Sequence, residues 1–243
     1  EGDDRRAEAI ALVAGWDGHA HAGSAAAAIA QAWLMHLNRL ILVDDLPGDV
    51  LDDYLPNDHL QQQPRRFMAI ALTDASSPWC DDSRTAARES CDDLARRALD
   101  LALADLRARL GPGMAGWRWG RLHTLVLTHQ PLGEAPLLGR LLNRRQANGG
   151  DAFTVDAAPP NPAAPYRQDK LPGYRQIITL RDDDVGRFNI AGGQSGHPLS
   201  RSYADRLGPH GAGDYAPLTL GRDHATGDVL RLEPLGSGAT GRP

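Results

Sequence analysis

The chain contains the run Gly192-Gly193-Gln194-Ser195-Gly196-His197-Pro198-Leu199-Ser200, in which three of the first five residues are glycine. Glycines at this density mark backbone that takes positive φ or approaches another group closely. Two segments with apolar residues in alternation precede the run, Tyr174–Arg181 and Val185–Ile190. They predict two strands, and Asp182-Asp183-Asp184 between them predicts a hairpin turn. The glycine-rich run is therefore expected at the end of a sheet.

The first half of the chain has a helical pattern. Apolar residues recur every three or four positions and predict three helices, over Arg5–Ala14, Ser24–Val43 and Thr85–Leu110. Ser24 is a favourable N-cap for the second helix, and Gly111 ends the third. Between the second and third helices, Asp44–Gln63 mixes Pro, Gly, Asp and Gln and is expected to form a loop with at most short turns.

The second half changes to a period of two residues. Further strands are predicted at Leu122–Thr128, Phe153–Ala157 and Val229–Leu232, whereas the proline-rich segment Ala157–Pro165 is expected to be a surface loop. Helices followed by strands indicate an α+β fold. We expect residues 1–120 to form a mainly helical region and residues 121–235 a β-rich region of the same domain, followed by a disordered tail over 236–243.

Composition excludes several classes of protein. The 243 residues are 42% hydrophobic and 23% charged, as in globular proteins. The net charge of −5 gives no basic excess for binding nucleic acid. No run approaches the roughly 18 apolar residues of a membrane span, so no membrane partner is expected. The sequence begins with neither Met nor a signal peptide, which favours a processed product or a fragment.

The two cysteines, Cys80 and Cys91, leave two alternatives open. They are 11 positions apart, the first in a predicted loop and the second in the first turns of a predicted helix. They are either two unpaired buried thiols or a disulfide that clamps the loop onto the helix. We expect the disulfide. A zinc site is not expected there, because no further Cys or His pair stands at ligand spacing nearby.

Several motifs occur together in one order along the chain. They are Trp16-Asp17-Gly18, Trp79-Cys80-Asp81-Asp82, Trp117-Arg118-Trp119-Gly120 with His123, Gly149-Gly150-Asp151, Tyr174-Arg175-Gln176-Ile177-Ile178, the glycine-rich run and Asp214-Tyr215-Ala216-Pro217. In this order they resemble the C-terminal part of the β-chain of the penicillin acylase family, which consists of N-terminal-nucleophile amide hydrolases. The resemblance implies a four-layer αββα sandwich of antiparallel sheets, of which this chain is one part.

The resemblance also implies a reaction and its partners. The family cleaves an amide with a side-chain nucleophile activated by its own α-amino group, so it needs Ser, Thr or Cys where this chain has Glu1. We therefore assign no catalytic residue here. The implied partners are the upstream part of the same β-chain, the α-chain and a small acyl amide: a β-lactam side chain, an N-acyl homoserine lactone or an acylated lipopeptide. The alternative is a non-catalytic scaffold or binding module that retains the acylase fold.

The resemblance implies no cofactor. Because members of the family are exported, it also implies a periplasmic or secreted protein. Two positions depart from the family pattern. Thr179 stands where an acidic residue is frequent, and His210 stands where Trp is frequent. The first departure removes an acid that would orient an active-site base. The second is expected to be a packing variant.

We expect the residues of this chain to hold the backbone around an active site and not to take part in the reaction. Gly192–Gly196 is the candidate supporting loop. Ser195 is not expected to be a nucleophile, because the nucleophile elbow is Gly-x-Ser-x-Gly before a helix, whereas His197 stands at the fifth position and Pro198 follows. We expect His123 to be a hydrogen-bonded structural residue. We expect His19-Ala20-His21 to be a solvated pair, and no metal site is assigned.

Overall fold

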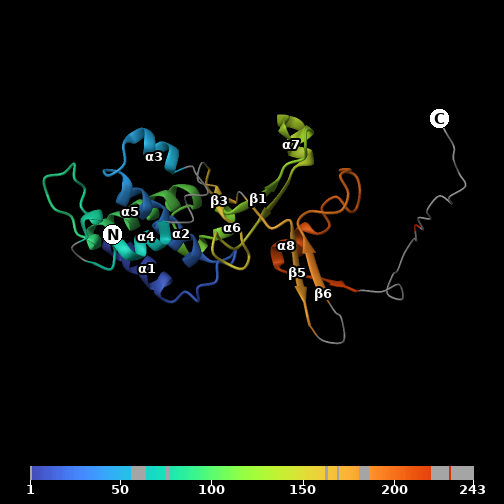
Figure 1. The fold of residues 1–243 in the computed structure, drawn as a ribbon, viewed down its shortest axis with the longest axis horizontal. Coiled ribbons are helices and arrows are strands. Elements are labelled where there is room, and N and C mark those ends of the chain that lie inside the picture. Colours follow the sequence, from blue (N-terminus) through green and yellow to red (C-terminus); the bar gives the residue numbers. More distant parts are fainter. Residues whose placement is uncertain are drawn as a thin grey trace, which may run out of the picture.

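The computed structural model describes residues 2–55, 64–74, 77–161, 164–168, 170–180, 186–219 and 230. Helices gather at one end of the molecule and a small sheet with one helix at the other, joined by a long hairpin (Figure 1). The fold is α+β with antiparallel sheets, as the sequence predicts. No described helix is long and apolar enough to cross a membrane.

Two long helices form the core of the helical end. They are α2 (Ala25–Leu42) and α5 (Cys91–Leu110), and α1 (Gly2–Ala14) packs against α2. The core side chains are buried and apolar: Ile29, Leu99, Leu106, Trp117 and Trp119 are among them. Burial contributes about 25 cal/mol per Å² of apolar area, so this interface between the helices supplies much of the stability of this end.

The N-caps decide where the long helices begin. Ser24 accepts a hydrogen bond from the backbone N–H of Ala27 and caps α2, as predicted. The predicted start of the third helix at Thr85 is wrong, because α5 begins at Cys91. Ser90 and Asp93 form a capping box there, which satisfies donors that the first turn leaves without partners.

The described residues between α2 and α5 include two short α-helices. The loop predicted over Asp44–Gln63 is wrong in part, because α3 spans Gly48–Tyr54. Helix α4 covers Pro64–Ala71, after the end of that predicted loop. One apolar side chain of each, Leu51 in α3 and Met68 in α4, is buried in a second core cluster. Burial against α2 and α5, rather than local periodicity, therefore stabilises these two helices.

The cysteines form a disulfide, which confirms the pairing preferred from the sequence. It joins Cys80, at the end of the short 3-10 helix Pro78–Cys80, to Cys91 at the start of α5. The closed loop also contains an ion pair, in which Arg84 donates to both carboxylate oxygens of Asp82 at 2.7 Å. These contacts hold residues 81–90 in a non-helical conformation.

The long hairpin consists of two strands that carry a helix at their tip. The first strand, β1 (Thr124–Leu127), confirms the prediction, and β2 (Arg144–Ala147) pairs with it antiparallel, from Thr124 opposite Ala147 to Leu127 opposite Arg144. The sequence pattern did not predict β2. Helix α7 (Pro136–Leu142) lies at the tip of the hairpin (Figure 1).

The strand predicted over Phe153–Ala157 is wrong. The carboxylate of Asp151 accepts hydrogen bonds from the backbone N–H groups of Phe153 and Thr154, at 2.7 and 2.9 Å, and a side chain that bonds to the backbone in this way favours a turn. The segment predicted to be only a loop contains β3 (Pro160–Asn161) and the start of β4 (Ala164–Gln168), which pair antiparallel.

The C-terminal sheet has three antiparallel strands. The predicted strands are β5 (Tyr174–Ile178) and β6 (Gly186–Ile190), paired from Tyr174 opposite Ile190 to Ile178 opposite Gly186. A third strand, β7 (Ala216–Leu218), pairs with β6 and was not predicted, and α8 (Leu207–Ala212) contacts β6. The predicted turn at Asp182–Asp184, the tail over 236–243 and all but Leu230 of the predicted strand Val229–Leu232 lie outside the described residues.

Candidate functional site

The glycine-rich loop directly follows β6. Gly192 has a φ of 85°, which is the left-handed region that glycine adopts without steric cost. Its carbonyl oxygen accepts a hydrogen bond from the backbone N–H of Arg206 at 2.7 Å. The entrance of the loop is thus fixed against the segment that leads into α8.

Close backbone approach explains the second glycine. A Cβ on Gly193 would lie 2.1 Å from the carbonyl oxygen of Ser202 and 2.8 Å from Oδ1 of Asp205. The backbone N–H of Ser195 donates to the same Ser202 oxygen at 2.9 Å. Residues 192–206 therefore close on themselves through backbone contacts that leave no room for a side chain at Gly193.

Ser195 has a local structural partner. Its Oγ accepts a hydrogen bond from the backbone N–H of His197 at 3.1 Å. Nδ1 of His197 in turn accepts from the backbone N–H of Leu199 at 3.2 Å. Both side chains are engaged with the backbone of their own turn, which is the arrangement expected of a structural serine rather than of a nucleophile held by a base.

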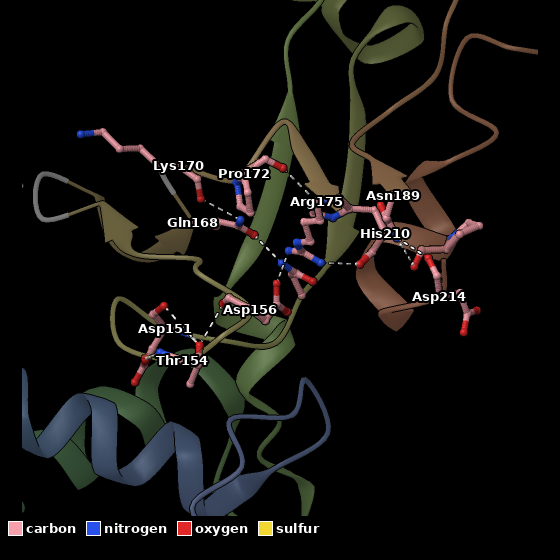
Figure 2. Close-up of polar contacts among 12 residues, drawn as sticks. Asp151, Thr154, Asp156, Gln168, Lys170, Pro172, Arg175, Asn189, His210 and Asp214 are labelled. Carbon is pink, nitrogen blue, oxygen red and sulfur yellow. Dashed lines mark hydrogen bonds and ion pairs between the residues drawn. The ribbon is translucent and has the colours of Figure 1, made fainter. Parts of the chain in front are cut away.

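Polar side chains from the loop before β3 and from β5 and β6 contact one another and the backbone of α8 (Figure 2). Arg175 on β5 pairs with the carboxylate of Asp156 and donates to the carbonyl oxygen of His210 at 3.3 Å. The amide of Asn189 on β6 donates to the carbonyl oxygens of Pro209, at 3.2 Å, and Asp214. These hydrogen bonds attach α8 and the residues just after it to the sheet.

A second group of polar side chains is buried near the hairpin. The side chain of Asn148 donates to Oε1 of Gln168 at 2.8 Å, and Gln168 donates to the carbonyl oxygen of Lys170 at 2.9 Å. Asn148 and Gln168 are both buried. The hydrogen bond between Asn148 and Gln168 attaches β4 to the residue that follows β2, whereas Oδ1 of Asn148 is buried without a hydrogen-bond partner among the described residues.

The two buried histidines are structural. His123 is fully buried, stacks on Trp119 with ring centroids 4.5 Å apart, and its Nδ1 lies 2.7 Å from the carbonyl oxygen of Tyr166. Burial lowers the pKa of His123 and, together with the charge of Arg175, lowers that of His210. Both therefore favour the neutral form, and His210 packs into the interior as expected.

The turn between α1 and α2 brings together a third group of side chains. His19 and His21 are exposed, as expected, and their ring centroids lie 5.4 Å apart. Asp17 lies beside them, with its Oδ2 3.9 Å from Nδ1 of His19. The sequence suggested the histidine pair but not the proximity of this carboxylate, since the turn geometry decides it.

The described residues of the glycine-rich loop contact backbone groups within residues 192–206. That this loop supports a site stays a prediction, and the sequence did not predict the polar contacts of β5 and β6. Arg175 lies in the motif Tyr174-Arg175-Gln176-Ile177-Ile178, which is only a weak indication of its ion pair. Nothing in the sequence indicated that Asp156 and Asn189 would make polar contacts. The geometry of this part of the chain thus consists of a glycine-rich loop closed by backbone contacts, the ion pair between Arg175 and Asp156, and buried amide side chains.

Comparisons with known proteins extend these observations. The family model for penicillin amidase matches residues 2–226. The acyl-homoserine lactone acylase QuiP of Pseudomonas fluorescens is 28% identical over 203 residues, which cover 82% of this chain and 24% of that protein. The protein of the same name from Pseudomonas aeruginosa is 28% identical over 218 residues, which cover 84% of this chain and 26% of that protein. The penicillin acylase 2 proenzyme of a Pseudomonas species is 24% identical over 221 residues, 90% of this chain and 27% of its own.

A solved structure has a similar fold. The thermostable penicillin G acylase from Alcaligenes faecalis superimposes with a TM-score of 0.52 at 15% identity, over 94% of this chain and 43% of that one. The chain spans about a quarter of the length of the curated relatives it matches.

Proposed function

Because this chain belongs to the penicillin amidase family, we propose that it is the C-terminal segment of an amidohydrolase that cleaves linear acyl amides. The observation that carries the proposal is the match of the family model to residues 2–226. The relatives that match most of this chain are named acylases, which supports it. The bond cleaved would join an acyl chain to an amine, and the product acid and amine would leave separately.

The substrate class that we favour is the N-acyl homoserine lactones. Six relatives named acyl-homoserine lactone acylases are 25–28% identical to this chain, whereas the penicillin acylase is 24% identical. The difference is small, so a β-lactam side chain and an acylated lipopeptide are kept as comparison substrates.

Exposed apolar surface supports association with further parts of an acylase. Leu137 and Leu141 on α7 are 75% and 71% exposed, and Ile178 on β5 is 62% exposed. Apolar side chains exposed together on short elements are typical of surfaces that another chain or segment covers. We propose that these partners are the upstream part of the same β-chain and the α-chain.

In this proposal, the nucleophile and the oxyanion donors come from those partners. The family's reaction needs a nucleophile activated by its own amino group and preorganised donors for the tetrahedral oxyanion. The glycine-rich loop and the polar contacts of Arg175 would hold the surrounding backbone in place. The disulfide suits an oxidising compartment, so we further propose a periplasmic or secreted location.

The test is to produce residues 1–243 alone and together with the upstream segments of the encoded protein. Amide cleavage is assayed with an N-acyl homoserine lactone, a penicillin and an acylated lipopeptide. We expect no cleavage by residues 1–243 alone, and cleavage, fastest for the lactone, by the assembly. An assembly of correct mass that cleaves none of the three substrates would instead favour a non-catalytic scaffold.

A further inference from the structure

The turn between α1 and α2 gathers three side chains that bind metals. One ligand atom from each of Asp17, His19 and His21 lies within 4.8 Å of the others. The side chains of His19 and Asp17 are 68% and 65% exposed, and His21 is also exposed. An ion from solvent therefore reaches all three without any rearrangement of the core.

The backbone that carries these side chains is already held in place. The indole N–H of Trp16 donates to the carbonyl oxygen of His19 at 2.9 Å. The backbone N–H of Gly150 donates to the carbonyl oxygen of Ala20 at 2.7 Å, so the turn is attached to a distant loop. Since the backbone is ordered before any ion arrives, binding would restrict only side-chain rotamers, which lowers its entropic cost.

The carboxylate is held as well. Oδ1 of Asp17 accepts a hydrogen bond from the backbone N–H of His19 at 2.9 Å, which leaves Oδ2 on the side of the imidazole. Outer contacts of this kind orient a ligand before the metal binds.

The donor set selects the class of metal. Two imidazoles and one carboxylate suit Zn²⁺ and similar transition metals, whereas Mg²⁺ and Ca²⁺ prefer sites formed from oxygen alone. In a tetrahedral zinc site with bonds of about 2.0–2.2 Å, ligand atoms lie roughly 3.4 Å apart. To bind zinc, the ligand atoms must approach one another by about 1 Å or a little more from their present separation of up to 4.8 Å. Rotation of the side chains about their χ angles supplies this movement.

We propose that Asp17, His19 and His21 form a Zn²⁺-binding site, with water in the fourth position. His19 and His21 are exposed, as expected of a solvated pair, and the proposal goes beyond that expectation because the carboxylate of Asp17 lies beside them. Its consequence is structural: bound zinc would fix the connection between α1 and α2. The inference does not depend on the proposed amide hydrolysis.

The experiment is isothermal titration of the full chain with Zn²⁺ in a buffer that does not bind metals. We expect one zinc per chain, and an affinity at least about tenfold weaker in each of His19→Ala, His21→Ala and Asp17→Asn. Asparagine retains an oxygen that accepts from His19 N–H, so Asp17→Asn tests the metal ligand rather than the turn. The control is His197→Ala, which removes an exposed histidine elsewhere and should bind zinc as the unaltered chain does.

A second readout locates the ion. In a histidine NMR spectrum, zinc should shift the ring signals of His19 and His21 and leave those of the buried His123 and His210 in place. The proposal is overturned if the unaltered chain binds no zinc, if the His19, His21 and Asp17 variants bind it unchanged, or if His197→Ala weakens binding as much as they do.

Discussion

The guanidinium of Arg175 on β5 pairs with the carboxylate of Asp156, which lies in the loop before β3. The Arg175 side chain is 11% exposed and the Asp156 side chain 33%. This pair joins the C-terminal three-stranded sheet to the central part of the chain, and His210 in α8 accepts from the same guanidinium.

Replacing Arg175 with Met should lower the free energy of unfolding by about 1.5–3 kcal/mol, because it removes a charge-assisted hydrogen bond to Asp156, whose side chain is 33% exposed. Denaturation in urea measures this. Arg187→Met on the neighbouring strand, where the side chain is exposed, is the matched control and should cost less than about 0.5 kcal/mol. Equal losses in the two variants would show that the ion pair does not hold the sheet.

Two glycines of the supporting loop should respond differently to the same substitution. In Gly193→Ala the new Cβ would lie 2.1 Å from a backbone oxygen, so the loop must shift, at a cost of about 1–3 kcal/mol. Gly196→Ala meets nothing within 4 Å and should be tolerated. Melting temperatures of the two variants decide the matter, and a larger loss at Gly196 would contradict the observed loop conformation.

Ser195→Ala should leave most of the kcat of an assembled, active enzyme. Its hydroxyl accepts one backbone hydrogen bond, worth about 0.5–1.5 kcal/mol, whereas loss of a nucleophile costs several orders of magnitude in rate. The assay is the rate of acyl-amide cleavage by the assembly with and without the substitution. A loss of kcat of that size, in a variant with unchanged melting temperature, would identify Ser195 as a reacting group.

Removing the disulfide should destabilise the helical end. Cys80 and Cys91 close a small loop, for which the chain-entropy account gives about 2–3 kcal/mol. The double variant Cys80→Ser/Cys91→Ser should show this loss in urea denaturation. Mass spectrometry of non-reduced peptides is the accompanying check on the native chain, and two free thiols in protein from an oxidising compartment would refute the pairing.

The ion pair between Arg84 and Asp82, inside the loop closed by the disulfide, predicts that stability depends on pH in the acid range. Hydrogen bonds from Arg84 hold the pKa of Asp82 down at about 2, against about 3.9 for an unfolded Asp. The folded state thus binds this proton less tightly, so the stabilisation is complete above about pH 4 and is lost as the pH falls toward 2.

Unfolding free energies measured in urea between pH 6 and 2 test this. In Asp82→Asn, the decrease in the free energy of unfolding between pH 4 and pH 2 should be smaller than in the native chain. The control is Asp53→Asn, which changes an exposed carboxylate on α3. An unchanged slope in Asp82→Asn would mean that the pair with Arg84 contributes nothing to folding.

Local sequence was enough to predict the elements that are long or strongly patterned. Helices α2 and α5 each bury a stripe of apolar residues at helical spacing, and β5 and β6 alternate apolar residues with others, so the period of these elements is visible in the chain. The strands β2, β3 and β7 are two to four residues long and have too few positions to show a period. The partners of β2 and β7 are also distant in sequence, about 20 to 30 residues away.

The sequence by itself determined the family, the α+β class, the glycine-rich loop and the choice of Cys80 and Cys91 as partners, because each depends on residue type and order. Only the tertiary structure decided that Asp156 meets Arg175, that Asp17 turns back onto His19, and that a side chain at Gly193 would strike Ser202. Those contacts arise from the path of the backbone between the residues, and turn conformation and packing, rather than local periodicity, set that path.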